Sequence, residues 1–283
     1  MSIDPVWLSS KFPDVSGLGR IGRGGQKWVF GGTHPADGEV VLKLFHPLAD
    51  PQRALREVQA ASEVRCPRVP RVFDIGDIAS PLGQMIWVRE QRIQGEDLRA
   101  RLARGPLDPN SLMRLALHSL EALAAAEQVR IVHRDVKPDN ILLATDGAFW
   151  LLDFGLARHL DKDSLTATAA PFGVGTAGYT ATEQFRNRKD EIDARADLFS
   201  LGVTLYECGC GKNPFREGAK DRMEMQKRIE DRPLPPIPCR VDGQNQFKDL
   251  VLAMTRTRRE QRISTVAEAL EWAREICAAE NIC

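Results

Sequence analysis

The most informative stretch of this chain runs from position 133 to position 140 and reads His133-Arg134-Asp135-Val136-Lys137-Pro138-Asp139-Asn140. It places a carboxylate, an ammonium and an amide group close together along the chain. A second carboxylate and a glycine follow in the segment Asp153-Phe154-Gly155. Carboxylate and amide oxygens are ligands that Mg²⁺ accepts, and an ammonium group attracts phosphate. The two segments together predict a site for a metal ion and phosphate groups.

The order and spacing of these residues resemble the signature of protein kinases, and of eukaryotic-like Ser/Thr kinases in particular. The resemblance covers roughly residues 18–275. It implies a bilobal α+β fold: a small β-rich lobe over about residues 17–90, a hinge over about 90–94 and a larger helical lobe over about 95–283. Residues 1–16 would form an N-terminal extension packed on the small lobe. The Gly-Gly-Gln-Lys sequence at positions 24–27 favours a bacterial member of the family.

The resemblance implies catalytic roles for Asp135, Lys137 and Lys43. Asp135 would accept the proton of the substrate hydroxyl, and Lys137 would neutralise the γ-phosphate. A lysine at this position marks Ser/Thr kinases rather than tyrosine kinases. ATP is the expected phosphate donor. Asn140 and Asp153 would hold Mg²⁺ through oxygen atoms, with Mn²⁺ as an alternative ion.

A glycine-rich segment stands where the family keeps the loop that covers the nucleotide. Glycines allow backbone N–H groups to approach phosphates closely, although Lys27 replaces the third glycine of the family pattern. Lys43 interrupts an apolar run at residues 40–45, and Glu57 matches the helix glutamate that orients this lysine in the family. The ATP-binding residues implied by the resemblance are Ile21, Gly22, Gly24, Gly25, Val29, Lys43, Glu57, Asn140 and Asp153.

The activation segment of the family corresponds to residues 153–183 here. An arginine at the position of Arg134 often pairs with a phosphate on this segment, and such a pair can order a loop. The phosphorylation candidates are Ser164, Thr166, Thr168 and Thr176. We hypothesise that autophosphorylation of Thr166 or Thr168 stabilises the active form. Thr176 is also expected to hydrogen-bond near Asp135 and Lys137.

Three further positions carry structural expectations. Glu183 is predicted to pair with Arg262. Thr182 replaces the proline that usually precedes this glutamate, which frees a backbone angle and affects substrate docking rather than chemistry. Asp197 is predicted to anchor the backbone of the catalytic loop. In the linker that would contact adenine, Arg89 and Glu90 both fit the residue guarding the back of the nucleotide site.

Patterning predicts the elements that carry these residues. A hairpin is expected at residues 21–33, strands at 40–45, 72–78 and 84–90, and a helix at 52–64. Asp108 followed by a proline predicts a helix start. Residues 197–208 are apolar nearly all round, which is typical of a buried helix. Thr265 and Glu268 form a candidate capping box for the last helix.

Composition excludes several other classes of protein. Lysine plus arginine and aspartate plus glutamate both number 39, so the net charge is near zero and does not favour nucleic-acid binding. No run of 18 apolar residues predicts a transmembrane helix, and the first residues lack the pattern of a signal peptide. The six cysteines form no CxxC pair that would predict zinc. We therefore expect a cytoplasmic signalling enzyme.

Two other functions share part of this residue pattern with an active Ser/Thr protein kinase. A pseudokinase, used as a binding module or ATP-binding scaffold, would be expected to lose Lys43, Asp135 or Asp153, and all three are present. Small-molecule kinases share the Asp…Asn…Asp arrangement but generally lack the lysine at position 137 and the segment at 175–183. The expected partners are protein substrates, and homodimerisation through the small lobe is left open.

Overall fold

The computed structural model describes most of the chain. The described residues are 3–23, 27–46, 51–154, 158–159, 173, 175–238 and 240–280, and the side chains of 23, 51–54, 57 and 158–159 also lie outside the description. Contacts divide the chain into two units. The first comprises Met1–Glu63 and Pro70–Gln94, and the second comprises Val64–Val69 and Gly95–Cys283. A β-rich unit and a helical unit together give the predicted α+β fold.

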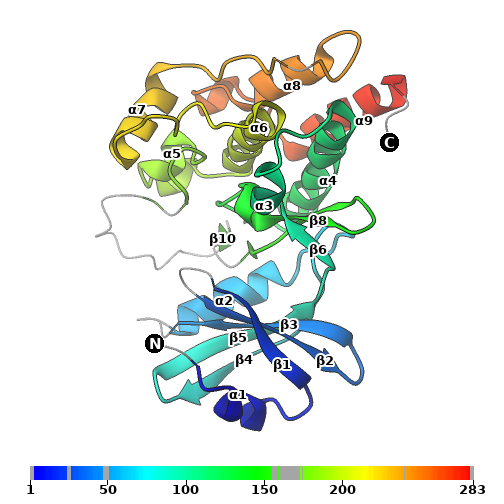
Figure 1. The fold of residues 1–283 in the computed structure, drawn as a ribbon. Helices are drawn as coiled ribbons and strands as arrows, with labels where there is room; N and C mark the ends of the chain where they lie inside the picture. The colour runs from blue at the N-terminus through cyan, green and yellow to red at the C-terminus, as the bar shows by residue number, and fades with distance from the viewer. Residues whose placement is uncertain are drawn as a thin grey trace. The chain divides into compact units, whose positions relative to one another are not determined.

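The first unit is built on one antiparallel sheet with strand order β1-β2-β3-β5-β4 (Figure 1). Its strands are β1 (Ser16–Arg23), β2 (Lys27–His34), β3 (Gly38–Phe45), β4 (Val72–Ser80) and β5 (Gly83–Gln91). Gly38 and Gly83 begin strands at tight turns with positive φ, a conformation that glycine adopts without strain. The predicted strands are confirmed, but β1 starts earlier than expected because its glycines read as a turn in the sequence.

Helix α1 (Pro5–Lys11) packs against β1 and covers one face of this sheet. The Asp4 side chain caps the helix by accepting a hydrogen bond from Val6 N–H at 2.8 Å. Leu8 is 1% exposed and joins a core that includes Trp28, Leu42 and Met85. The segment before the predicted sheet is therefore part of the core of the first unit.

Helix α2 (Pro51–Ala61) packs on β4 and β5. Its Val58 forms a second apolar cluster with Ile86 and Val88 of β5. Ile86 and Val88 alternate along the strand with Met85 and Trp87, which join the α1 cluster. The alternation of side chains along β5 thus supplies two separate apolar layers, one on each face of the sheet.

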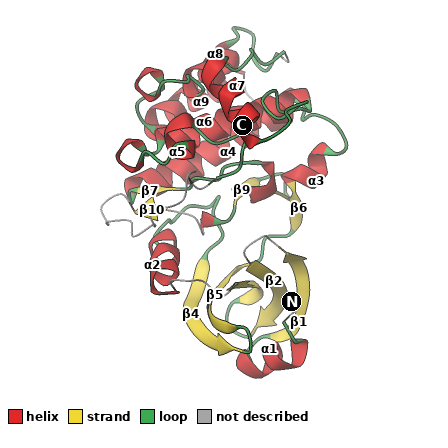
Figure 2. Cartoon of the chain, turned by 90° about the vertical axis from the view of Figure 1, so that its left-hand side faces the viewer, coloured by secondary structure: helices red, strands yellow, loops and turns green. Residues whose placement is uncertain are grey.

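The second unit is mainly helical (Figure 2). Its α-helices are α3 (Leu98–Leu102), α4 (Pro109–Gln128), α5 (Thr182–Phe185), α6 (Arg195–Cys210), α7 (Arg222–Asp231), α8 (Gln246–Met254) and α9 (Val266–Glu280). In the described part of this unit, short 3₁₀ turns with defined bounds include η1 (Pro138–Asn140), η3 (Lys189–Glu191) and η4 (Arg259–Gln261). Its strands are β6 (Gly95–Asp97), β7 (Ile131–Val132), β8 (Ile141–Ala144), β9 (Phe149–Leu151) and β10 (Arg158–His159).

The helix signals read from the sequence are largely confirmed. Asp108 caps α4 by accepting a hydrogen bond from Ser111 N–H at 2.9 Å. Helix α6 is buried over nearly its whole length, as its apolar pattern predicts. At α9, Thr265 Oγ1 accepts from Glu268 N–H at 3.1 Å, but the Glu268 carboxylate accepts from Ser264 N–H rather than from Thr265 N–H. The capping box is therefore displaced by one residue on its return bond.

Candidate active site

The loop between β7 and η1 carries the sequence signature and is held by a buried carboxylate. Asp197, in the first turn of α6, accepts hydrogen bonds from the backbone N–H groups of His133 and Arg134, each at 2.7 Å. Burial raises the pKa of the Asp197 carboxyl, and the His133 side chain and the two N–H donors act in the opposite direction. Arg134 has a φ of 69°, a left-handed conformation that costs a non-glycine residue energy. The predicted role of Asp197 as the anchor of this loop is confirmed.

The polar side chains of Asp135, Lys137, Asn140 and Thr176 form one cluster next to the backbone segment that Asp197 holds. The Asp135 carboxylate accepts hydrogen bonds from Lys137 Nζ at 2.7 Å, from Thr176 Oγ1 at 2.7 Å and from Asn140 Nδ2 at 3.0 Å. Lys137 Nζ also lies 2.5 Å from Thr176 Oγ1. The expected contact of Thr176 with Asp135 and Lys137 is thus present. The arrangement holds a carboxylate and an ammonium in fixed positions beside each other.

His133 joins this loop to the segment that contains Asp153. Its Nδ1 accepts from Asp135 N–H at 3.3 Å, and its Nε2 lies 2.8 Å from the Leu152 carbonyl oxygen. These two bonds select the tautomer protonated at Nε2. The ring also contacts the Phe154 ring, with 4.6 Å between the centroids. His133 and Phe154 therefore act in packing and orientation, as the sequence suggests.

Asn140 and Asp153 supply the oxygen atoms that a divalent cation would need. The Asn140 Nδ2 group donates to the Asp135 backbone oxygen at 2.8 Å, so the amide is oriented with its nitrogen toward Asp135. The amide oxygen takes no part in that bond. Asp153 has a φ of 67°, an unusual backbone conformation of the kind found at ligand sites. Mg²⁺ is usually held by one or two carboxylates together with phosphates and water, which this donor set fits.

The first unit aligns several residues predicted to bind the nucleotide. Gly22 pairs with Val29 between β1 and β2, and Val29 pairs with Lys43 between β2 and β3. These three residues consequently stand in one row across three strands. Ile21, beside this row, is 49% exposed. Gly24 and Gly25 lie outside the described residues, so their predicted contact with phosphates stays a prediction.

Lys43 has a partner that the sequence did not indicate. Its Nζ lies 2.5 Å from Oε1 of Glu90, and the two side chains are 9% and 11% exposed. The side chain of Glu57, the expected partner, lies outside the described part of the chain, although its backbone belongs to α2. Ser164, Thr166 and Thr168 also lie outside the described residues. Their phosphorylation stays a hypothesis.

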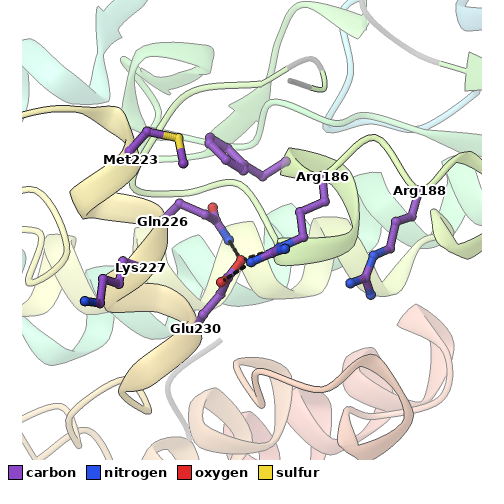
Figure 3. A pocket seen from close by; sticks show the side chains of 7 residues that line it. Arg186, Arg188, Met223, Gln226, Lys227 and Glu230 are labelled. Carbon is purple, nitrogen blue, oxygen red and sulfur yellow. Dashed lines mark hydrogen bonds and ion pairs between the residues drawn. The ribbon is translucent and has the colours of Figure 1, made fainter. Parts of the chain in front are cut away.

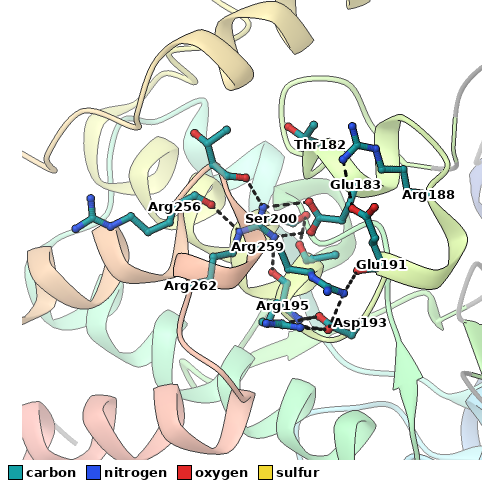
Figure 4. A network of polar contacts seen from close by, with 12 residues as sticks. Thr182, Glu183, Arg188, Glu191, Asp193, Arg195, Ser200, Arg256, Arg259 and Arg262 are labelled. Atoms are coloured by element: carbon teal, nitrogen blue, oxygen red, sulfur yellow. Dashed lines mark hydrogen bonds and ion pairs between the residues drawn. The ribbon is translucent and has the colours of Figure 1, made fainter.

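The end of the activation segment is tied to the helical core by an ion pair (Figure 4). The Glu183 carboxylate accepts bonds from Arg262 Nη1 at 2.6 Å and Nη2 at 3.1 Å. The Arg262 guanidinium also donates to the backbone oxygens of Arg256, Arg195 and Thr257. The predicted pair is confirmed, and it forms although Thr182 replaces the usual proline.

A second polar group near this segment was not recognised from the sequence. Arg99 donates to Glu207 and to the Tyr179 hydroxyl, each at 2.6 Å, and the Tyr179 hydroxyl donates to Glu207. Burial, together with Glu207, raises the pKa of Tyr179 to about 12. The one available signal was Glu207 itself, a carboxylate near the end of the largely apolar stretch 197–208, which must find a partner when buried.

A separate pocket of about 590 Å³ lies between α5 and α7 (Figure 3). Its described lining residues are Phe185, Arg186, Arg188, Met223, Gln226, Lys227 and Glu230. Arg186 is paired with Glu230 across the pocket wall, at 2.8 and 2.5 Å. None of the predicted catalytic residues lines this pocket, so it is distinct from the cluster around Asp135.

The two units and the cluster around Asp135 have the organisation of a protein kinase domain. The comparison with protein families agrees, because the model of the protein kinase domain matches residues 16–277. The chain belongs to this family. In the part of the chain that the structure describes, no helix combines the length and apolar character required to cross a bilayer.

Among curated proteins, the chain is similar to bacterial serine/threonine-protein kinases. It is 33% identical over 223 residues to a probable serine/threonine-protein kinase of Corynebacterium efficiens, covering 76% of this chain and 33% of the relative. It is 34% identical over 220 residues to serine/threonine-protein kinase PknB of Mycobacterium tuberculosis, covering 76% of this chain and 34% of the relative. The chain thus spans about a third of the length of these relatives.

Proposed function

We propose that this chain is a Ser/Thr protein kinase that transfers the γ-phosphate of ATP to hydroxyl groups of proteins in the presence of Mg²⁺. The observation that carries the proposal is the cluster in which Lys137 and Thr176 both contact the Asp135 carboxylate. A carboxylate held beside an ammonium can receive a hydroxyl proton while the ammonium neutralises a transferring phosphate. Phosphoryl transfer needs little more from a protein than such positioning and charge.

Each residue of the cluster has one task in this proposal. Asp135 orients the attacking hydroxyl and accepts its proton. Lys137 stabilises negative charge on the transferring group. Thr176 contacts both Lys137 and Asp135 and so fixes their side chains relative to each other. Asn140 and Asp153 would hold Mg²⁺, which supplies charge neutralisation between the phosphates when bound. Lys43 would contact the α- and β-phosphates.

Two observations favour a protein substrate over a small molecule. Lys137 is present, and Thr176, which contacts it, belongs to the segment that presents protein substrates in the family. The relatives are named serine/threonine-protein kinases. We further propose that the chain phosphorylates Thr166 or Thr168 of its own activation segment. The alternative of a pseudokinase predicts nucleotide binding without transfer.

The test is incubation of purified chain with Mg²⁺, γ-labelled ATP and a generic protein substrate, followed by mapping of phosphate by mass spectrometry. Asp135→Asn and Lys43→Ala serve as matched variants, and thermal unfolding checks that they fold. We expect label on Ser or Thr with the unaltered chain, and a loss of orders of magnitude in both variants. ATP binding without label in the unaltered chain would favour the pseudokinase. In a parallel incubation with small-molecule alcohols in place of the protein, label on those alcohols alone would favour a small-molecule kinase.

A further inference from the structure

Lys43 and Glu90, two residues on neighbouring strands of the first unit, form a buried contact. In the register of β3 and β5, Lys43 stands opposite Val88, and Glu90 stands opposite Val41. Residues two apart on a strand share a face, so Lys43 and Glu90 lie diagonally on the same face of the sheet. Their charged atoms are 2.5 Å apart.

The same face of the sheet carries apolar side chains. Charged groups among them lose contact with water, which costs free energy. Val88, opposite Lys43, packs in the cluster with Ile86 and with Val58 of α2. Lys43 and Glu90 are only 7% and 8% exposed as whole residues. Charges so poorly solvated are kept only when paired, because an isolated buried charge is costly. The contact between Lys43 and Glu90 therefore offsets part of the cost of burying both charges.

Arg89, the residue before Glu90, does not share the face of the sheet on which Lys43 lies. Arg89 Nη2 lies 3.2 Å from Asp37 and 3.8 Å from Asp74. Its side chain therefore belongs to the opposite face of β5 from that of Glu90. From the sequence, Arg89 and Glu90 are equal candidates for the residue that guards the back of the nucleotide site. The contact with Lys43 selects Glu90.

We propose that Glu90 is a positioning residue for phosphoryl transfer, because it holds the Lys43 ammonium on the sheet in the orientation that meets phosphate. This proposal rests on the proposed function for the role of Lys43. An ammonium has three N–H donors, so it can bind Glu90 and phosphate oxygens at the same time. Strands β3 and β5 are paired from Val40 with Gln91 to Leu44 with Trp87. The carboxylate that contacts Lys43 therefore stands on a strand that is hydrogen-bonded to the strand of Lys43.

Replacement of Glu90 should lower kcat without raising the KM for ATP. Glu90→Gln keeps the size of the side chain and an acceptor oxygen but removes the charge that fixes Lys43. We expect kcat to fall about tenfold or more, as for loss of a hydrogen bond between charged groups. The KM for ATP should stay equal or decrease, because the variant site is more positive toward phosphate. Glu90→Asp, which retains the charge, should recover part of the activity.

The experiment combines these kinetics with the chemical reactivity of Lys43. Reductive methylation with formaldehyde, mapped by mass spectrometry, measures how accessible and reactive the Lys43 amine is. This measurement does not depend on catalysis. Glu90→Gln should raise methylation of Lys43 severalfold and leave exposed Lys227 unchanged as an internal reference. Asp74→Asn, which removes a carboxylate of the same sheet paired with Arg89, is the matched control and should alter neither measurement. Thermal unfolding verifies each variant, and Glu90→Asp replaces Glu90→Gln if the latter does not fold.

Wild-type values of kcat and of Lys43 methylation in Glu90→Gln would overturn the proposal. A rise in kcat would also overturn it, since Glu90 would then hold the lysine away from the nucleotide. Should the unaltered chain transfer no phosphate at all, the proposed function fails. The methylation comparison then still decides whether Glu90 controls the Lys43 amine.

Discussion

Glu183 and Arg262 form a buried ion pair, with 2.6 Å between Oε1 and Nη1 and side-chain exposures of 4% and 0%. Removing one member of a buried pair leaves the other charged and unsolvated. We predict that Arg262→Ala lowers the free energy of unfolding by about 3–5 kcal/mol, measured by urea denaturation. Glu183→Ala should do the same, and the double variant should lose less than the sum of the two.

The Arg186–Glu230 pair provides the contrast, because its Arg186 side chain is 50% exposed. Arg186→Ala should cost only about 0–1 kcal/mol. Equal losses for Arg262→Ala and Arg186→Ala would mean that the burial of the first pair has no energetic consequence.

Thr176 links the two groups that would carry the chemistry. Thr176→Val removes the hydroxyl that contacts Asp135 and Lys137 while preserving the shape of the side chain. Loss of a hydrogen bond to a charged group is worth about 1.5–3 kcal/mol, which corresponds to roughly a 10- to 150-fold decrease in kcat. Initial-rate kinetics with a protein substrate measure this effect. Thr176→Ser retains the hydroxyl and should keep most of the activity, and an equally inactive serine variant would contradict the explanation.

Helix α1 should contribute directly to the stability of the first unit. Leu8 is 1% exposed in the core that α1 shares with the sheet, whereas Val6 on the same helix is 78% exposed. Truncation of a buried leucine to alanine costs about 2–5 kcal/mol, while surface substitutions usually stay within about 0.5 kcal/mol. Leu8→Ala should therefore lower the unfolding temperature clearly and Val6→Ala should not. Similar small shifts in both would show that α1 is dispensable.

His118 should make the stability of the second unit depend on pH. Burial, with nearby Arg68 acting in the same direction, lowers the pKa of His118 to about 4, against about 6.5 in an unfolded chain. Between about pH 6.5 and pH 4 the unfolded chain binds a proton that the folded chain does not. The stabilisation is complete above this window and is lost as the pH falls through it.

His118→Asn isolates this effect, since the asparagine Oδ1, which is bonded to Cγ as His118 Nδ1 is, can still accept the hydrogen bond from Phe149 N–H, which is 3.1 Å long in the unaltered chain. Unfolding temperatures measured at pH 7.5, 6 and 5 should fall less in the variant than in the unaltered chain. Parallel curves for the two proteins would show that His118 does not titrate in this window.

The sequence was sufficient for features that depend on short spacings. The segment 135–140 contains Asp135, Lys137 and Asn140. Residues so close along the chain are expected to lie close in space, so their order alone indicates a shared site. The Asp108 cap and the buried helix α6 were also readable, because caps and apolar periodicity are local properties. The capping box at Thr265 was only half correct, since its return bond depends on how the chain enters the helix.

The residues that were missed depend on pairing between distant segments. Arg99, Tyr179 and Glu207 come from three parts of the second unit, and no local pattern relates them. Glu57 is expected beside Lys43 from family spacing, and that contact stays a prediction because its side chain lies outside the described residues. Nothing in the sequence singled out Glu90 as a partner of Lys43. Their contact follows from the register of two strands that are joined through a long intervening stretch of chain.

The sequence by itself determined the family and the segments that bear the catalytic groups, because those groups follow one another along the chain at fixed intervals. Only the tertiary structure showed that the Glu90 carboxylate contacts Lys43. A shift of one residue in the register of β3 and β5 would turn Glu90 to the other face and bring Arg89 toward the lysine. That register is set by the packing of both faces of the sheet, on α1 and on α2, and no short stretch of sequence contains it.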